Sequence, residues 1–394
     1  MKSKICFLIL LLTISLILLA CQEEPDSFSR LEKLIIDVFD PQPGEKVLIM
    51  TDLPHGGLND YELWSDRRLM AEEWQASFAG MEDELELSVY PLLTYPATGS
   101  HNGPLPETGT VDGQEALFEE VLADTNIVVA LTEFSATAPL VGYTEKYSNL
   151  RAASMPGATR AMENTALAAD YAEMAPKCEM LAEHLNRAEG ANLTFSTGDE
   201  LFIDLRFRRA HVDDGQLHAN KHGDRVINLP SGEAYMAPYE GEMPGQISKT
   251  AGIVPLPVAN GSFVQVRLEE NRVVEVLGEG PEVEDLRFDF SIDDGRRNLA
   301  ELGLGCNDMA VITGNVLEDE KVFGVHLAGG LSEHIGGTVD VDDFLDPGAA
   351  EHTDVVFPFG GDIEITTLVL EYEDGTSGEI IKDSRYVIFD DLTN

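Results

Sequence analysis

Basic residues are scarce in this sequence of 394 residues. Lys and Arg together number 26 against 71 Asp and Glu, so the formal net charge at pH 7 is -45. A surface this negative repels phosphate groups, and we therefore expect no nucleic-acid partner. Hydrophobic residues nevertheless make up 43% of the chain, which is enough for a folded core and excludes an acidic disordered tail. The length favours two domains.

A long hydrophobic run occurs only at the start of the chain. Lys2 and Lys4 precede an apolar stretch over residues 5–19, which contains no acid and indicates a secretory signal. The stretch ends in Leu-Leu-Ala before Cys21 and resembles a bacterial lipobox, in which the cysteine is lipidated after cleavage. A short membrane anchor is the alternative, but the run is brief for a bilayer span. We expect a signal peptide over residues 1–20, an acidic tether over 21–29, and an extracytoplasmic lipoprotein anchored in the membrane through Cys21.

Cysteine and tryptophan are also rare. Of four cysteines, Cys6 and Cys21 belong to the signal and its cleavage site, which leaves Cys178 and Cys306. No pattern in the sequence argues for pairing them, so we expect two unpaired thiols. The two tryptophans, at residues 64 and 74, follow helical spacing with apolar neighbours and are predicted to be core residues.

The first part of the mature chain alternates short apolar strands with amphipathic helices. This pattern predicts an open, parallel-type α/β domain with connecting helices over residues 30–190. The expected elements are a strand at 47–50, a helix starting at 59–60, a strand at 85–89, a helix over 112–123, a buried strand at 127–131, and two helices or one kinked helix over 160–187.

The pattern changes after residue 190 to strand-like alternation with many turn dipeptides. We predict a mixed, sheet-rich α+β domain over residues 191–394 that carries the metal site, closed by a hairpin over 363–389. No repeat is evident at solenoid or propeller periods.

Four segments of this second half each place a possible metal ligand near glycines or in a strand. Glu233 follows a Pro-Ser-Gly turn, Glu301 precedes two glycines, and His326 lies in an apolar stretch. His352 and Asp354 are two apart, so in a strand they project from the same face and can hold one ion. Taken singly, each is more often a surface charge, a solvated pair or a buried histidine bonded to a carbonyl.

The combination of these segments resembles the aminopeptidase T family of thermophilic metallo-aminopeptidases, which includes aminopeptidase S. The matching motifs occur in the family's order: Pro-Ser-Gly-Glu at 230–233, Ala-Glu-Leu-Gly-Leu-Gly-Cys-Asn at 300–307, Asp-Glu-Lys at 319–321 before His326, Gly-Gly at 336–337 and His-Thr-Asp at 352–354. The resemblance is strongest over residues 227–354.

The resemblance implies a site for two divalent metal ions with five ligands: Glu233, Glu301, His326, His352 and Asp354. Mixed imidazole and carboxylate donors suit zinc, cobalt or manganese. The implied activity is release of N-terminal residues from peptides by a metal-activated water, with Glu301 or a neighbour moving the proton. The resemblance also implies a possible homodimer.

The sequence departs from the family's pattern at three places. The family has a tyrosine seven residues after the strand histidine, where this chain has Glu333 followed by His334. The group that the tyrosine supplies is therefore either absent or replaced by His334, which is the candidate catalytic residue here. Residues 339–346 form an acidic stretch that could bind calcium, although a solvated loop is favoured. Cys306 stands where the family has threonine, and we expect it to pack beside the site.

Two other functions remain open from the sequence. The same fold family includes mononuclear iron dioxygenases that open dihydroxypyridine rings, and His326, His352 and Asp354 would suit Fe(II). Retention of Glu233 and Glu301 argues against a single-iron site. The second alternative is a non-catalytic lipoprotein that binds a ligand between its domains.

The histidines at residues 55, 218 and 222 are expected in loops.

Overall fold

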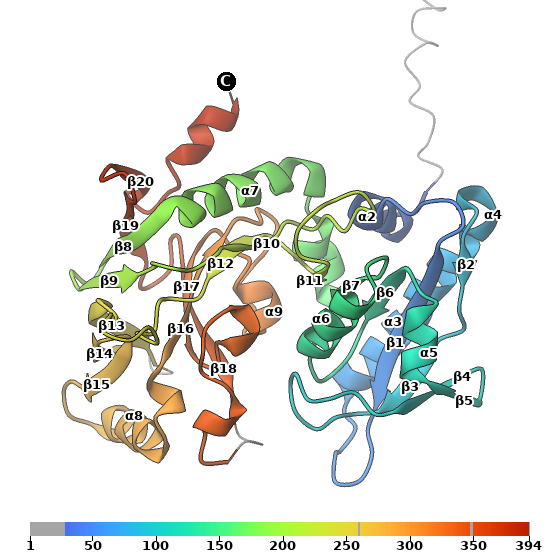
Figure 1. Ribbon diagram of the computed structural model, residues 1–394, viewed down its shortest axis with the longest axis horizontal. Helices are drawn as coiled ribbons and strands as arrows, with labels where there is room; N and C mark the ends of the chain where they lie inside the picture. The colour runs from blue at the N-terminus through green and yellow to red at the C-terminus, as the bar shows by residue number, and fades with distance from the viewer. Residues whose placement is uncertain (1–27, 259–260, 347–349, 394) are drawn as a thin grey trace, which may run out of the picture.

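The structure is a computed structural model that describes residues 28–258, 261–346 and 350–393 (Figure 1). The predicted signal peptide, Cys21 and most of the predicted tether lie outside the described residues. Among the helices that are described, none is both long enough and apolar enough to span a bilayer.

The first half of the chain forms an eight-stranded sheet in the order β11-β7-β6-β1-β3-β4-β5, with β2 beside β1. Strands β11, β7, β6, β1 and β3 run parallel, and β4 and β5 add an antiparallel edge. The strands are β1 (Lys46–Leu53), β2 (Ser88–Val89), β3 (Leu93–Pro96), β4 (Thr108–Val111), β5 (Gln114–Leu117), β6 (Ile127–Ala130), β7 (Arg151–Ser154) and β11 (Val226–Asn228).

Helices cover both faces of this sheet, as expected for a parallel α/β arrangement. Val47 and Ile49 of β1 pack in one cluster with residues of α2 (Arg30–Phe39) and α3 (Glu62–Gly80). Leu48 and Met50 alternate with them and pack on the other face against α5 (Phe118–Ala123) and α6 (Thr137–Lys146). Both tryptophans of α3 are buried in the core, which confirms their prediction.

Two predicted elements of this half are wrong. Residues 108–117 form the β4–β5 hairpin instead of the start of a helix, because Asp112 and Gly113 adopt φ values of 49° and 70° and turn the chain. The strand expected over residues 85–89 is reduced to β2, since Leu85 ends the short helix α4 (Glu82–Leu85).

The second half contains two antiparallel sheets (Figure 1). A five-stranded sheet has the order β10-β12-β16-β17-β18, with β10 (His211–Asp213), β12 (Glu233–Met236), β16 (Leu299–Gly305), β17 (Gly324–Gly330) and β18 (His352–Pro358). A seven-stranded sheet has the order β15-β14-β13-β9-β8-β19-β20, with β8 (Ala188–Phe195), β9 (Glu200–Asp204), β13 (Ala251–Pro257), β14 (Phe263–Glu269), β15 (Arg272–Val276), β19 (Ile365–Tyr372) and β20 (Ser377–Lys382). The predicted fold class is confirmed, as is the closing hairpin, which is formed by β19 and β20.

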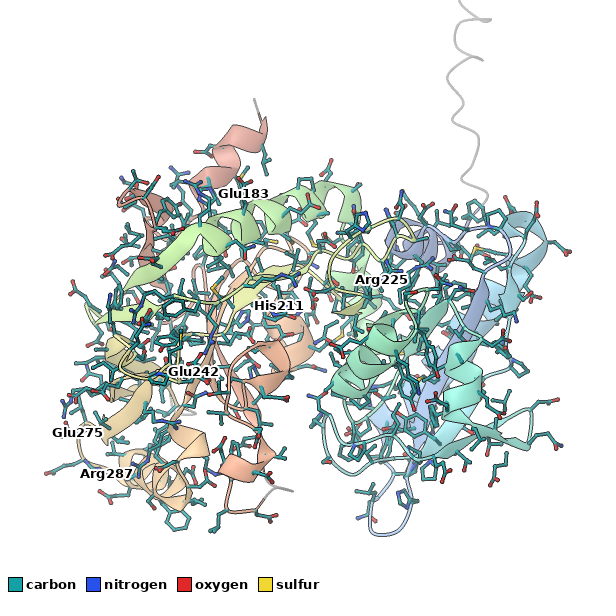
Figure 2. The ribbon with its side chains drawn as sticks, viewed as in Figure 1. Glu183, His211, Arg225, Glu242, Glu275 and Arg287 are labelled. Carbon is teal, nitrogen blue, oxygen red and sulfur yellow. The ribbon has the colours of Figure 1, made fainter. Side chains whose placement is uncertain are left out.

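Helix α7 (Tyr171–Arg187) connects the halves and continues through Pro176, after the short 3-10 turns η1 (Arg160–Asn164) and η2 (Ala166–Ala168). The second half of the chain also contributes a strand to the first sheet. Strand β11 follows β10 in sequence but pairs with β7 of the first sheet. Among the described residues, the second half also contains the helices α8 (Pro281–Ile292), η3 (Gly295–Arg297), α9 (Val316–Asp319), η4 (Glu333–Ile335), η5 (Val341–Asp343) and η7 (Ile388–Thr393). Charged side chains, among them Glu183, Glu242 and Glu275, are spread over the molecule (Figure 2).

Candidate metal centre

The five predicted metal ligands lie on four neighbouring strands of the five-stranded sheet. Glu233 begins β12, Glu301 lies within β16, His326 lies within β17, and β18 begins with His352 and carries Asp354 two residues later. The structure therefore brings together every ligand that the resemblance implied.

The pairing register explains why these side chains converge. Glu301 and Asp354 both pair with Ala328, one from each side of β17, and His326 lies two residues before Ala328 on the same face. His326 pairs with Gly303, where any side chain would overlap the imidazole. Small residues at positions 303 and 328 therefore leave room for the donor groups.

Glu301 lies between the two imidazoles. Its Oε1 is 2.9 Å from His326 Nε2, and its Oε2 is 3.3 Å from His352 Nε2. Glu233 Oε2 lies 3.2 Å from His326 Nε2, and Asp354 Oδ1 lies 3.6 Å from His352 Nε2. The donors thus form two groups of three that share Glu301, each compact enough for one ion.

The donor atoms fit divalent cations. Glu233 Oε2 and Asp354 Oδ1 are buried but accept no hydrogen bond from the described residues, and buried carboxylate oxygens are normally satisfied. His352 Nδ1 lies 2.7 Å from the Leu331 carbonyl oxygen, which orients Nε2 towards the donor groups. Imidazole nitrogens and carboxylate oxygens in this mixture suit zinc, cobalt or manganese.

The charged side chains of the centre shift one another's pKa values. Burial by itself raises the pKa of Glu301, but hydrogen bonds from His326 and His352 outweigh it and lower the pKa. Burial lowers the pKa of both imidazoles, and the neighbouring carboxylates outweigh this effect and raise it. The pocket therefore stabilises positive charge, which a bound cation would supply.

A buried lysine next to the ligands was not predicted as a site residue. Lys321 is 0% exposed, and its Nζ donates to Glu233 Oε1 and, at 2.6 Å, to Glu320 Oε1. Asp213 Oδ2 is 3.7 Å away. Burial, opposed by the Lys321 charge, raises the pKa of Glu320 to about 8 and that of Asp213 to about 7. The Asp-Glu-Lys motif at 319–321 was the feature of the sequence that could have identified Lys321 as a site residue.

His334, predicted to be catalytic, lies beside the ligands. Its ring is 5.1 Å from the His352 ring, centroid to centroid, in an edge-to-face arrangement. Burial and the neighbouring His352 lower the pKa of His334 to about 4, so the imidazole is neutral at neutral pH. Glu333, which occupies the family's tyrosine position, is exposed.

Tyr235 is a second residue that the sequence reasoning missed. It follows Glu233 by two residues in β12 and lines the cavity next to the candidate donors. Its ring stacks on that of His211 of β10 at a centroid distance of 5.3 Å. Burial raises the pKa of its hydroxyl well above the ordinary value. The spacing rule applied to His352 and Asp354 would have found it.

A cavity of about 550 Å³ covers the centre, and residues from the first half of the chain form its opposite wall. Glu133 and Phe134, just after β6, lie in that wall, and their backbone N–H groups donate to buried Asp52 at 2.8 and 3.1 Å. Arg67 pairs with Glu133 at 2.6 Å. These loops follow the carboxyl ends of parallel strands, where open α/β sheets commonly bind ligands.

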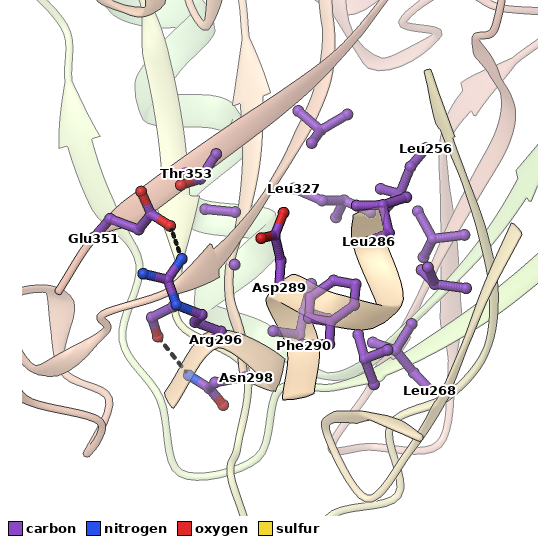
Figure 3. Close-up of a pocket in the computed structure, with 18 residues that line it drawn as sticks. Leu256, Leu268, Leu286, Asp289, Phe290, Arg296, Asn298, Leu327, Glu351 and Thr353 are labelled. Carbon is purple, nitrogen blue, oxygen red and sulfur yellow. Dashed lines mark hydrogen bonds and ion pairs between the residues drawn. The ribbon is translucent and has the colours of Figure 1, made fainter. Parts of the chain in front are cut away.

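The opposite face of the five-stranded sheet closes a smaller, mainly aliphatic cavity of about 240 Å³ (Figure 3). Leu327, between His326 and Ala328 in β17, lines this second cavity, and Phe290 of α8 lies across from it. Strand β17 therefore presents the candidate donor His326 on one face of the sheet and the apolar side chain of Leu327 on the other.

The other candidate residues lie elsewhere. His55 bonds the Ala97 carbonyl oxygen, and His218 bonds the Asp37 carbonyl oxygen, as expected for loop residues. In the acidic stretch, the side chains of Asp340 and Asp343 cap the short helix η5 by accepting hydrogen bonds from the backbone N–H groups of Asp342 and Asp340.

Solved structures that share this fold include a dioxygenase and a protein named AmpT. A 2,5-dihydroxypyridine dioxygenase from Pseudomonas putida KT2440 aligns with a TM-score of 0.60 and 14% identity, covering 91% of this chain and 98% of that one. AmpT from Thermus thermophilus aligns with a TM-score of 0.51 and 18% identity, covering 91% and 99%. No curated protein is similar enough to count as a match.

A family model described as thermophilic metalloprotease (M29) matches residues 139–338, about half of the chain. The matched region contains Glu233, Glu301, His326 and His334 and ends before His352. The chain belongs to the thermophilic metalloprotease (M29) family and is a metal-dependent peptidase by that membership.

Proposed function

We propose that the protein is an aminopeptidase that releases N-terminal amino acids from peptides with the help of two divalent metal ions. The observation that carries this proposal is the position of Glu301, which belongs to both three-residue donor groups. A shared carboxylate is the arrangement that holds two ions close together. AmpT, a structural neighbour, belongs to the aminopeptidase T family that the sequence resembles.

Two ions held by these ligands would polarise the scissile carbonyl and lower the pKa of a water molecule. The chain's own residues would supply positioning and proton transfer. A carboxylate of the centre, Glu301 or the neighbouring Glu320, would take up the proton that the attacking water loses. The neutral His334 imidazole, next to His352, would hydrogen-bond the substrate where the family has a tyrosine.

The acidic character of the cavity supports an exopeptidase. Carboxylates from both walls line it, and those of Asp213, Glu133, Glu233 and Glu320 outnumber the two basic side chains that pair with them, Lys321 and Arg67. A free N-terminal ammonium is attracted by such a lining, whereas an acylated N-terminus carries no charge. We therefore infer that the enzyme requires a free amino terminus.

Metal analysis combined with peptide release tests the proposal. We expect about two divalent ions per chain after loading with zinc, cobalt or manganese, and release of the first residue from a free peptide. The same peptide with an acetylated N-terminus should not be cleaved. Cleavage of the acetylated peptide at internal bonds would show an endopeptidase and overturn the aminopeptidase proposal.

The similarity to the dihydroxypyridine dioxygenase makes a mononuclear iron enzyme the second candidate. His326, His352 and Asp354 could serve as two imidazoles and one carboxylate for Fe(II). One iron per chain, with oxygen consumption on a dihydroxypyridine and no peptide release, would favour this candidate.

We also propose that the enzyme is attached to the membrane, outside the cytoplasm, through a lipid on Cys21. Cys21→Ala should move the protein from the membrane to the soluble fraction. Membrane attachment without Cys21 would contradict this proposal.

We further propose that the enzyme forms a homodimer. Light scattering should give twice the chain mass, and a monomeric mass would contradict this proposal.

A further inference from the structure

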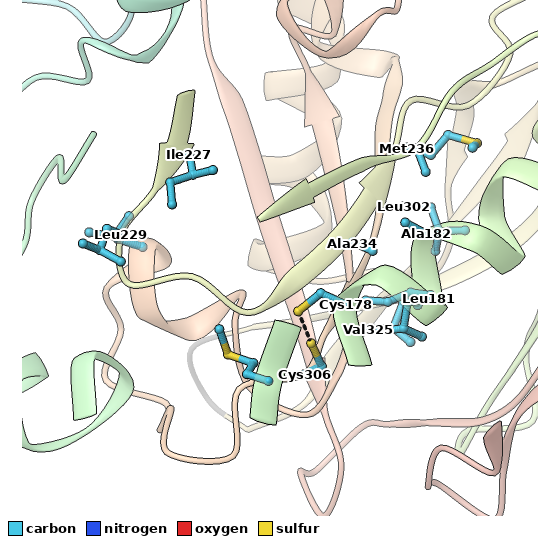
Figure 4. Packing of buried hydrophobic residues seen from close by; sticks show 14 of the residues in the cluster. Cys178, Leu181, Ala182, Ile227, Leu229, Ala234, Met236, Leu302, Cys306 and Val325 are labelled. Atoms are coloured by element: carbon cyan, nitrogen blue, oxygen red, sulfur yellow. Dashed lines mark hydrogen bonds between the residues drawn. The ribbon is translucent and has the colours of Figure 1, made fainter. Parts of the chain in front are cut away.

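The two cysteines of the described residues meet in the core, although 128 positions separate them. Cys178 lies in the middle of α7, and Cys306 directly follows β16. Their sulfur atoms are 2.7 Å apart, and both side chains are 0% exposed (Figure 4). From the sequence alone we expected two unpaired thiols; the fold brings them together.

The surroundings hold both cysteines in place. Leu181, Ala234 and Val325 lie near the sulfur pair in the apolar core (Figure 4). The backbone N–H of Cys306 donates to the Gly232 carbonyl oxygen at 2.7 Å, which anchors it beside β12. Neither sulfur therefore has to travel far to find the other.

We propose that Cys178 and Cys306 form a disulfide bond, a modification site that ties helix α7 to the strand carrying Glu301. A disulfide has a sulfur–sulfur distance of about 2.05 Å, so each sulfur would move by about 0.3 Å from its present position. The bond would join the connecting helix to β16, five residues beyond Glu301.

The bond forms by exchange with a small disulfide such as oxidised glutathione. The thiolate of one cysteine attacks a sulfur of the oxidant, giving a mixed disulfide and releasing one small thiolate. The second cysteine, as its thiolate, attacks the bound protein sulfur and releases the other small thiolate. Both protein thiols lose their protons, the protein supplies two electrons, and the oxidant leaves as two thiols.

Burial determines when this exchange can occur. It raises the pKa of the Cys178 thiol well above its ordinary value, so the folded protein contains little thiolate. The bond therefore forms while the chain folds, in the oxidising compartment that the proposed location outside the cytoplasm provides. Once folded, the protein shields the bond from small reducing thiols for the same reason.

The disulfide should stabilise the metal-bearing sheet. It closes a loop of more than 120 residues in the unfolded chain, and long loops lose the most conformational freedom on closure. We expect the melting temperature of the metal-loaded enzyme to be higher by about 5 °C in the disulfide form than in the reduced form.

Peptide mapping of the full chain tests the bond directly. The protein is unfolded and refolded in a mixture of reduced and oxidised glutathione, then alkylated in denaturant without reductant. We expect one disulfide-linked pair of peptides containing Cys178 and Cys306, and no alkylated form of either. Recovery of both cysteines as alkylated thiols would overturn the proposal.

Melting temperatures provide a second readout with a matched control. Wild-type protein unfolded, reduced and refolded with reductant should lose about 5 °C relative to the oxidised form. The double variant C178A/C306A, whose alanines fit the apolar site, should melt at the same temperature under both treatments. An equal reductant effect on wild type and double variant would contradict the proposal.

Discussion

Gly303 lies across from His326 in the β16–β17 ladder, and the imidazole fills the space into which a side chain at residue 303 would project. A methyl group at this position must displace the ring of His326, a proposed metal ligand. The absence of a side chain at residue 303 is therefore a condition for the metal centre.

Replacing Gly303 with alanine should disturb the centre more than the fold. We expect Gly303→Ala to bind at least one divalent ion fewer per chain, because His326 can no longer reach Glu233 and Glu301. Elemental analysis after dialysis, with circular dichroism to check folding, measures this. Gly329→Ala in β17 is the control, since the nearest atom to its new methyl would be 3.6 Å away. Full metal content in Gly303→Ala would contradict the arrangement.

Glu301→Gln should remove the group that both donor sets share. The amide keeps the shape of the side chain but replaces one of the oxygens facing the two imidazoles with a nitrogen donor and removes the charge. We expect the rate of peptide hydrolysis to fall by at least about 100-fold, with the fold intact. Glu333→Gln, an exposed change beside His334, should retain activity. Equal rates in the two variants would show that Glu301 has no such role.

Lys321→Met should destabilise the metal-free protein strongly. The buried ammonium neutralises Glu233, Glu320 and Asp213, and its loss leaves carboxylates without a partner. We expect the free energy of unfolding to fall by about 3–5 kcal/mol in urea titrations with chelator present. The exposed pair of Lys382 with Glu379 provides the control, and Lys382→Met should cost less than about 1 kcal/mol. Similar losses in the two variants would be inconsistent with the buried cluster.

His334 should make the metal-free protein less stable in mild acid. Its folded pKa of about 4 lies below the ordinary value of 6.5, so the imidazole is neutral in both states above pH 6.5. Between pH 6.5 and 4 the unfolded chain binds a proton that the folded chain does not, and stability falls as the pH falls.

Comparison with His334→Asn isolates this contribution, because asparagine does not titrate. The difference in unfolding free energy between wild type and variant should change by up to about 3 kcal/mol between pH 7 and pH 4, to the disadvantage of the wild type. A difference that stays constant over this range would show that the pKa of His334 is not lowered.

Local patterns predicted much of the first sheet but not its antiparallel edge. The apolar run at residues 127–131 became strand β6, and the helical spacing around Trp64 and Trp74 became α3. The helix expected over residues 112–123 is wrong at its start, because Asp112 and Gly113 adopt positive φ values and form the turn of a β-hairpin, for which Asp-Gly is a strong sequence signal.

The metal ligands were predicted from motifs, and their neighbours were not. Lys321 was noticed as part of a motif without a role, since the sequence cannot show that its ammonium is buried. Tyr235 was missed although its spacing from Glu233 follows the alternation of a strand. Burial depends on what packs against a residue, and that packing comes from distant segments.

By itself, the sequence determined which donors the chain offers and in what order, and it placed His352 and Asp354 on one strand face, because neighbouring side chains in a strand alternate. Only the tertiary structure decided that Glu301 lies between two imidazoles, that Lys321 is enclosed by carboxylates, and that Cys178 meets Cys306. These relations arise from the pairing and packing of segments far apart in the chain, which no local pattern specifies.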